Sequence, residues 1–360
     1  MKRKAQLVLL FLSGLISAAF SATVLADESL SVYSWVDYID PKSIEGFERE
    51  FGVKVNLHTY STADELSGLL AKKAPIDVVF PTYTGLADFV KLSYLKKLDV
   101  SLLPHRKGLD SAIMSKLAAV DTENAYSVPY AWGAYGVVIN TDLVEKVYGS
   151  PLPNSWSIFF EPQIISALSR CGVSIADYPS RIVGITMMYQ GKSIERSSPR
   201  QIKKAIDELL KIRQYLRTVD VRQHVTDMEE GKICVALTWT GESFLAAKAG
   251  RPIKFLIPEE GTIGFIDTVA IPESSPRPDL AHKFIDYLLR PEVAAQTTKY
   301  TLNANAVPES KVYLADEIKK YPQLYTTSSQ NKLITMLQPL NSRQSETLDS
   351  EWKKFKSGTE

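Results

Sequence analysis

The sequence predicts an α/β fold in which short buried strands alternate with amphipathic helices. Short apolar runs recur along the chain, and patterns with helical periodicity lie between them. The first runs follow the order strand–helix–strand–helix–strand, which is typical of a parallel sheet. The 360 residues are also enough for two domains of ordinary size.

The N-terminal part supplies three of these strands and two helices. Strands are predicted over residues 30–33, 53–58 and 76–80. Pro41 opens a helix over residues 41–51, because proline is well tolerated in the first helical turn. Ser61 or Thr62 can cap a second helix that runs through Lys72.

The rest of the chain continues in the same style. Further strands are predicted over residues 135–139, 233–237, 253–257 and 266–271. Helices are predicted over residues 199–217 and 278–289, and Pro291 opens another helical stretch. About 55 residues at the C-terminal end are more polar, and we expect them to be mainly helical.

The composition is that of an ordinary globular protein. Hydrophobic residues make up 45% and charged residues 23%, which excludes a disordered or collagen-like chain. The 42 Lys and Arg residues are balanced by 41 Asp and Glu residues. We therefore expect no nucleic-acid partner.

Residues 1–26 have the pattern of a secretory signal peptide. Lys2, Arg3 and Lys4 precede an apolar run over residues 7–20, and small residues end at Ala26. The run is shorter than the roughly 20 residues of a membrane-spanning helix, although an uncleaved anchor is the alternative. Cleavage after Ala26 would leave 334 residues with a net charge of −2.

Cys171 and Cys234 are the two cysteines of the chain. In an exported protein an isolated pair is a candidate disulfide, and two buried free thiols are the alternative. A bridge would close a loop of 63 residues. The chain-entropy model values such a loop at about 4 kcal/mol of stability.

A search for catalytic and metal-binding patterns finds no convincing set. The four histidines are isolated, and none has metal-ligand spacing with another: they are His58, His105, His224 and His282. The sequence has no nucleophile elbow and no dinucleotide-binding glycine pattern. We therefore expect a binding protein rather than an enzyme, with no metal and no cofactor.

Acidic residues stand beside aromatic residues near the ends of three predicted strands. These residues are Trp35, Asp37 and Tyr38, then Trp239 and Glu242, then Phe265 and Asp267. Ligands of open α/β sheets bind at the carboxyl ends of strands. Aromatic faces attract cations and carboxylates bind ammonium groups, so these residues suit an alkyl diamine. Core aromatics and solvated or helix-capping acids are the alternative.

Several stretches, taken in order and spacing, resemble the periplasmic polyamine-binding proteins of ABC importers. The resemblance is greatest to the putrescine-binding branch and covers nearly all of the chain after residue 26. The stretches that carry it are residues 33–38, 76–81, 128–133, 171–174, 227–236, 239–242, 257–261, 287–293 and 303–305.

The resemblance implies two α/β lobes joined by crossing strands, with the ligand trapped between them when the lobes close. One lobe would comprise residues 27–134 and 259–303, and the other residues 135–258 and 304–360. It implies a Cys171–Cys234 disulfide, a periplasmic monomer, a small amine as ligand and a membrane permease as partner.

The resemblance also implies roles for individual residues. Those that keep the family pattern are Trp35, Asp37, Tyr38, Trp239, Phe265 and Asp267. The first three would line the ligand stem and hold one ammonium group, Trp239 would stack on the ligand and Asp267 would bind an amine. Thr84, or less preferably Thr82, corresponds to a serine of the site.

Four positions depart from the family pattern. Val36 replaces a serine, Glu242 an aspartate, and Thr301 a tyrosine. Arg181 falls where a glutamate commonly holds an amine. Either Arg181 points away and pairs with an acid, or the ligand end that it meets is anionic or neutral.

The sequence leaves other functions open beside polyamine capture for an importer. A cleft with Arg181 inside it would suit a carboxylate-bearing amine, such as a basic or ω-amino acid. A sensor or another non-transport surface protein could keep the same fold. An enzyme that uses the same cleft is the remaining class, which is disfavoured because the sequence shows no set of nucleophile and general base.

Overall fold

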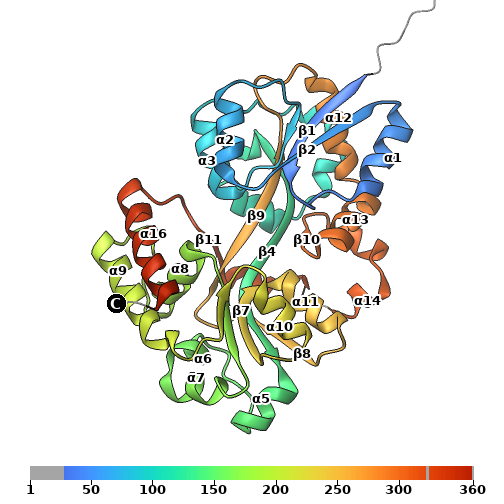
Figure 1. The fold of residues 1–360 in the computed structure, drawn as a ribbon. Coiled ribbons are helices and arrows are strands. Elements are labelled where there is room, and N and C mark those ends of the chain that lie inside the picture. Colours follow the sequence, from blue (N-terminus) through green and yellow to red (C-terminus); the bar gives the residue numbers. More distant parts are fainter. Residues whose placement is uncertain (1–27, 322–323, 359–360) are drawn as a thin grey trace, which may run out of the picture.

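The computed structural model describes residues 28–321 and 324–358. The predicted signal peptide at residues 1–26 lies outside these ranges. Within them, no helix is both long and apolar enough to cross a membrane. The described chain forms an upper and a lower group of elements, and two long strands run between the groups (Figure 1).

The upper group begins with the predicted strand–helix order. Its first elements are β1 (Ser29–Trp35), α1 (Pro41–Phe51), β2 (Lys54–Tyr60), α2 (Ala63–Ala71), β3 (Val78–Val79) and α3 (Tyr83–Lys91). β1 pairs in parallel with both β2 and β3, as predicted. Thr62 is the residue that caps α2, through a bond from the Glu65 amide. β3 is shorter than predicted, although the whole apolar run of residues 76–80 is buried.

The connection to the lower group ends in β4 (Ser127–Asn140), a strand of 14 residues that are all buried. It follows η1 (Val100–Leu102), η2 (Pro104–Gly108), α4 (Ser111–Leu117) and η3 (Thr122–Asn124). The sequence predicted a strand over residues 135–139 alone. Pro129 and Gly133 are poor strand formers, and the register shifts between Pro129 and Ala131. The longer strand therefore escaped detection.

The lower group is formed mainly by the helices and strands that follow β4 and precede β9 in the chain. Its elements are α5 (Thr141–Tyr148), α6 (Ser157–Phe160), α7 (Pro162–Leu168), β5 (Val173–Ala176), α8 (Pro179–Tyr189), α9 (Pro199–Arg213), β6 (Thr218–Asp220), α10 (Gln223–Glu229), β7 (Val235–Trp239), α11 (Thr240–Lys248) and β8 (Ile253–Leu256). β5 pairs in parallel with β6 and β7. The predicted helix over residues 199–217 was too long, because Arg217 and Thr218 lead into β6.

The C-terminal part returns to the upper group and then to the lower one. Its elements are β9 (Thr262–Ala270), α12 (Pro278–Leu288), α13 (Pro291–Thr301), β10 (Ala304–Asn305), η4 (Pro308–Tyr313), α14 (Asp316–Lys319), α15 (Ser328–Leu333), β11 (Ile334–Met336) and α16 (Ser342–Ser357). α16 packs against α9 (Figure 1). The predominantly helical C-terminal region matches the prediction, apart from the short strands.

The strands follow the order β2-β1-β3-β9-β4-β7-β5-β6. The sheet is mixed rather than purely parallel, because β9 is antiparallel to both β3 and β4. The first part of β4 pairs with β9 and β10, and its last part pairs with β7 and β8. β4 therefore belongs to both groups of elements.

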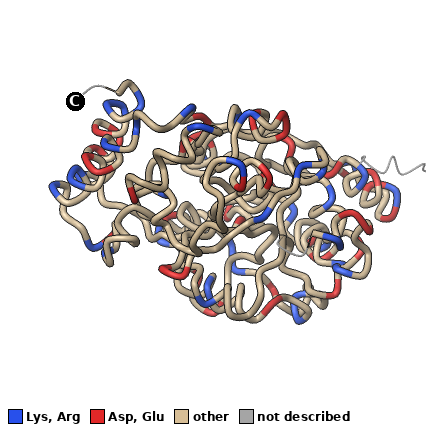
Figure 2. Tube along the Cα trace, turned by 90° about the horizontal axis from the view of Figure 1, so that it is seen from below, with Lys and Arg blue, Asp and Glu red and all other residues tan. Residues whose placement is uncertain are grey.

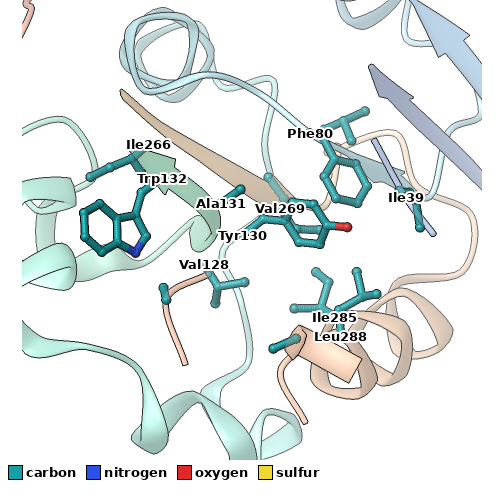
Figure 3. Close-up of a cluster of buried hydrophobic side chains, with 14 of the residues drawn as sticks. Ile39, Phe80, Val128, Tyr130, Ala131, Trp132, Ile266, Val269, Ile285 and Leu288 are labelled. Atoms are coloured by element: carbon teal, nitrogen blue, oxygen red, sulfur yellow. The ribbon is translucent and has the colours of Figure 1, made fainter. Parts of the chain in front are cut away.

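Two large hydrophobic cores flank this crossing. The first packs residues of β1, β3, α1 and α12 against the start of β4, and Figure 3 shows part of it around Phe80, Tyr130 and Val269. The second packs α7, α8, α9 and α16 around β5 and β7, and includes Trp156 and Trp352. Charged residues of both signs are interspersed over the described chain (Figure 2). Any charge selectivity must therefore come from a local site.

Candidate ligand-binding site

A cavity of about 940 Å³ lies where elements of the two groups meet. The upper group contributes the end of β1 and the start of α3, and the lower group contributes α10, the start of α8 and the start of α11. The middle of β9 and the end of α13 complete the wall. The lining residues that the sequence analysis named are Trp35, Tyr38, Thr82, Thr84, Arg181, Trp239, Glu242, Phe265, Asp267 and Thr301.

Asp267 lies inside the cavity in the middle of β9, opposite Ala131 of β4. The sequence placed Phe265 and Asp267 at the opening of a strand, but β9 begins three residues before Phe265. The hydroxyl of Tyr38 donates a hydrogen bond to Oδ2 of Asp267. Burial raises the pKa of this carboxyl to about 6, although the Tyr38 bond and the Arg181 charge both favour its ionised form.

Two tryptophans form aromatic walls of the cavity. The Trp239 ring packs edge-on against Phe265, with centroids 4.8 Å apart, and lies 5.6 Å from Tyr178. The Trp35 indole meets Tyr60 at 4.6 Å and donates its Nε1 hydrogen to the Phe80 carbonyl at 2.9 Å. Trp239 also packs on Tyr135, with centroids 3.6 Å apart, so these contacts hold both indoles in place at the cavity wall.

Glu242 stands in the first turn of α11 and is already bonded within the protein. His224 Nε2 lies 2.8 Å from Oε2 of Glu242, and the Thr238 hydroxyl donates to the same oxygen. A Cβ at Gly241 would approach the Leu302 carbonyl to 2.5 Å, so this turn needs glycine to pack against the end of α13. Glu242 therefore faces the cavity with one oxygen engaged.

Arg181 faces the cavity from the first turn of α8. Its Nη1 donates to the Ser180 hydroxyl at 2.8 Å, and its buried Nε has no hydrogen-bond partner. None of the ion pairs found among the described residues includes Arg181. The outward, acid-paired arrangement weighed from the sequence is therefore not the one that the structure contains.

Val36 and Asp37 are not among the residues that line the cavity. Val36 is 53% exposed, and Asp37 is also exposed. The chain turns sharply here, because Asp37 adopts a left-handed φ of 54°. This turn brings Trp35 and Tyr38 to the cavity and leaves the two residues between them at the surface.

The three threonines of the site differ in the freedom of their hydroxyls. Thr82 caps α3 by accepting a bond from the Gly85 amide, and its hydroxyl lies 3.2 Å from that of Thr84. Thr301 donates to the Thr297 carbonyl and accepts from the Asn303 amide. The Thr84 hydroxyl therefore has the most hydrogen-bonding capacity left for a ligand among the three threonines.

Several lining residues escaped the sequence analysis, among them Tyr178, Arg222 and Glu229. Tyr178 could have been found, because it is the second residue after β5 and ligands bind at the carboxyl ends of strands. Arg222 and Glu229 belong to a short helical region without a clear sequence signal. Among the described residues, no group of His, Cys, Asp and Glu is arranged to hold a metal ion.

The cysteines form the expected disulfide, with Cα atoms 5.5 Å apart. Cys171 precedes β5 and Cys234 precedes β7, so the bridge joins the starts of two neighbouring parallel strands. Trp239 stands at the other end of β7. The disulfide therefore stabilises the lower group of elements without taking part in the cavity.

Comparisons with known proteins agree on the family and the fold. The model for bacterial extracellular solute-binding proteins matches residues 42–326. A putrescine/agmatine-binding protein of Pseudomonas aeruginosa is 32% identical over 367 residues, covering 100% of both chains. The putrescine-binding periplasmic protein of Escherichia coli is 32% identical over 362 residues, covering 97% of this chain and 98% of the relative.

A solved structure has the same architecture. The spermidine/putrescine ABC transporter substrate-binding protein of Streptococcus pneumoniae superposes with a TM-score of 0.79 at 20% identity. The match covers 92% of this chain and 99% of that one. The predicted two-lobed α/β fold is thereby confirmed. The chain belongs to the bacterial extracellular solute-binding protein family.

Proposed function

We propose that this protein captures a polyamine or a related alkyl amine between its two lobes and delivers it to the membrane permease of an ABC importer. The observation that carries the proposal is Asp267, a carboxylate placed between aromatic walls in the cavity. The names of the full-length relatives, which bind putrescine, agmatine or spermidine, support the same class of ligand.

The chemistry of the cavity suits such a ligand. An ammonium group at Asp267 would gain a charge-assisted hydrogen bond and would offset the cost of holding the carboxylate away from water. The indole of Trp239 can cover the methylene stem or attract a second cation by about 0.5–2 kcal/mol. The cavity provides counter-charge and apolar cover together, as a small-molecule site requires.

Capture would depend on movement of the lobes. We assign residues 27–134 and 259–303 to one lobe and residues 135–258 and 304–360 to the other. The crossing strands β4 and β9 support this division, whereas the first hydrophobic core continues across it through residues such as Ala236, Phe255 and Met336. Closure around the ligand would bring Asp37, now exposed beside the cavity, nearer to the bound amine.

The same proposal includes the cellular setting. The segment at residues 1–26 would direct export and be removed, leaving a monomer in the periplasm. The protein would perform no bond chemistry of its own. The binding-protein relatives support this assignment.

A melting-temperature assay on refolded, ligand-free protein tests the proposal. Putrescine, cadaverine, spermidine, spermine and agmatine are added separately, and a bound amine should raise the melting temperature by mass action. Asp267→Asn should weaken binding of the active amine by at least about tenfold, because it removes the counter-charge.

The control is Asp349→Asn, which changes an exposed aspartate on α16 and should leave the affinity unchanged. The proposal fails if none of the five amines, and no amine that carries a carboxylate, alters the melting temperature.

A further inference from the structure

Arg181 is a positive charge inside the cavity for which the described residues supply no carboxylate partner. Arg181 lines the cavity wall, and its Nη1 donates to the Ser180 hydroxyl, which carries no charge. A guanidinium that lines a cavity without a carboxylate partner can bind an anionic group, so this arrangement indicates a charge that is supplied from outside the chain.

The acids of the cavity do not neutralise Arg181. Three acids line the cavity: Glu242 is engaged by His224 and Thr238, Asp267 by Tyr38, and Glu229 is in none of the ion pairs found among the described residues. Arg181 lies near enough to Asp267 to lower the pKa of that carboxyl against the larger effect of burial, yet it forms no ion pair with it. The two opposite charges therefore line one cavity without pairing with each other.

The helix that carries Arg181 adds to the positive character of this point. The first turn of α8 lines the cavity through Tyr178 and Arg181, and the helix has no side-chain cap at its N-terminus. A helix N-terminus carries a partial positive charge, although here Pro179 has no amide hydrogen and the Arg181 amide donates to the Tyr178 carbonyl. An ammonium group placed here would be repelled, whereas a carboxylate could accept bonds from the guanidinium.

We infer that the ligand carries a carboxylate at one end and an ammonium or guanidinium group at the other. Arg181 binds the carboxylate, Asp267 binds the cationic end, and the aromatic walls cover the stem. The ligand class is an ω-amino acid or a basic amino acid. This inference rests on the proposed function and narrows its ligand.

Matched pairs of ligands test the inference by calorimetric titration of ligand-free protein. The pairs are 4-aminobutanoate with putrescine, 5-aminopentanoate with cadaverine, ornithine with putrescine, and arginine with agmatine. Each pair compares a carboxylated molecule with an amine of matching chain that lacks the carboxylate. The carboxylated member should bind at least about tenfold more tightly in one or more pairs.

Two variants connect the preference to Arg181. Arg181→Gln should weaken the carboxylated ligand by about tenfold and leave its carboxylate-free partner unchanged or tighter. Arg181→Glu should reverse the preference within the pair. The control is Arg200→Gln, an exposed arginine of α9 outside the cavity. Melting temperatures without ligand verify that each variant is folded.

The outcomes separate this inference from the function beneath it. If the carboxylate-free amine binds more tightly in every pair, or if Arg181→Gln leaves the ratio unchanged, the inference is overturned while amine capture stands. If no member of any pair binds, the proposed function fails and the inference fails with it.

Discussion

In the ligand-free protein, the ionised carboxylate of Asp267 is destabilised by burial. Burial disfavours its charge, and the hydroxyl of Tyr38 and the nearby Arg181 compensate only in part. Such a cost is common at binding sites, where a ligand later supplies the missing interaction. The free energy of unfolding of the ligand-free protein should therefore depend on the ionisation of Asp267.

The resulting pH dependence of the free energy of unfolding has a defined sign. The pKa of Asp267 is about 6 in the folded protein and 3.8 ordinarily, so the folded state binds the proton more tightly. The free energy of unfolding should fall as pH rises from about 4 to about 6, by no more than about 3 kcal/mol. Urea unfolding at several pH values measures it.

Asp267→Asn serves as the reference, because it removes the titrating group and keeps an acceptor for Tyr38. The difference in unfolding free energy between this variant and the natural chain should grow with pH up to about 6 and then level off. A difference that is constant across this range would contradict the assigned pKa shift.

The acid-and-aromatic pattern together with the family resemblance predicted much of the cavity wall, and local backbone geometry explains the exceptions. Trp35, Tyr38 and Asp267 line the cavity as expected. Asp37 belongs to the same acid-and-aromatic pattern, but its left-handed backbone turns it to the surface. A one-dimensional pattern contains no information on that turn, nor on whether the side chain of Arg181 points into the cleft.

Among the elements, β5 and β7 divide structural and ligand-facing roles between their two ends. Their starts are joined by the disulfide, and their carboxyl ends lead to Tyr178 and Trp239 in the cavity. A change at one end should therefore affect folding stability, and a change at the other should affect binding.

Replacing both Cys171 and Cys234 by serine tests this division. The free energy of unfolding should fall by about 4 kcal/mol, because the 63-residue loop is no longer closed in the unfolded chain. Ligand affinity, measured by titration well below the melting temperature of the variant, should stay within about twofold. A large loss of affinity in folded variant protein would show that the bridge shapes the cavity.

Elements with strong local signals were predicted well, and the crossing strands were not. α1 was predicted with its observed bounds, because Pro41 and an amphipathic pattern define it locally. β4 lost more than half of its length in the prediction, since the residues before Tyr135 include Pro129 and Gly133. Pairing with β9, far along the chain, holds these residues in a strand.

On the scale of the whole molecule, the two hydrophobic cores share β4 and β9. β4 pairs with β9 in the upper group and with β7 and β8 in the lower group, and all of its 14 residues are buried. Unfolding of one core would expose part of this strand, so the two cores should be thermodynamically coupled.

Differential scanning calorimetry tests this coupling. The ligand-free protein should unfold in one transition, with the calorimetric enthalpy equal to the van't Hoff enthalpy. A saturating ligand should move this transition upward as a whole. Two resolved transitions, or a shift of one part of the profile by ligand, would show that the cores unfold separately.

The position of β9 in the sheet also determines when the two cores can be completed during synthesis. β9 lies between β3 and β4, yet it begins at Thr262, after nearly three quarters of the 360-residue chain. Until that segment is present, β3 keeps an unpaired edge and neither core has all its strands. Contacts over such sequence separations form slowly. We therefore expect a nascent chain of this topology to complete its two cores only after the segment that contains β9 has been synthesised.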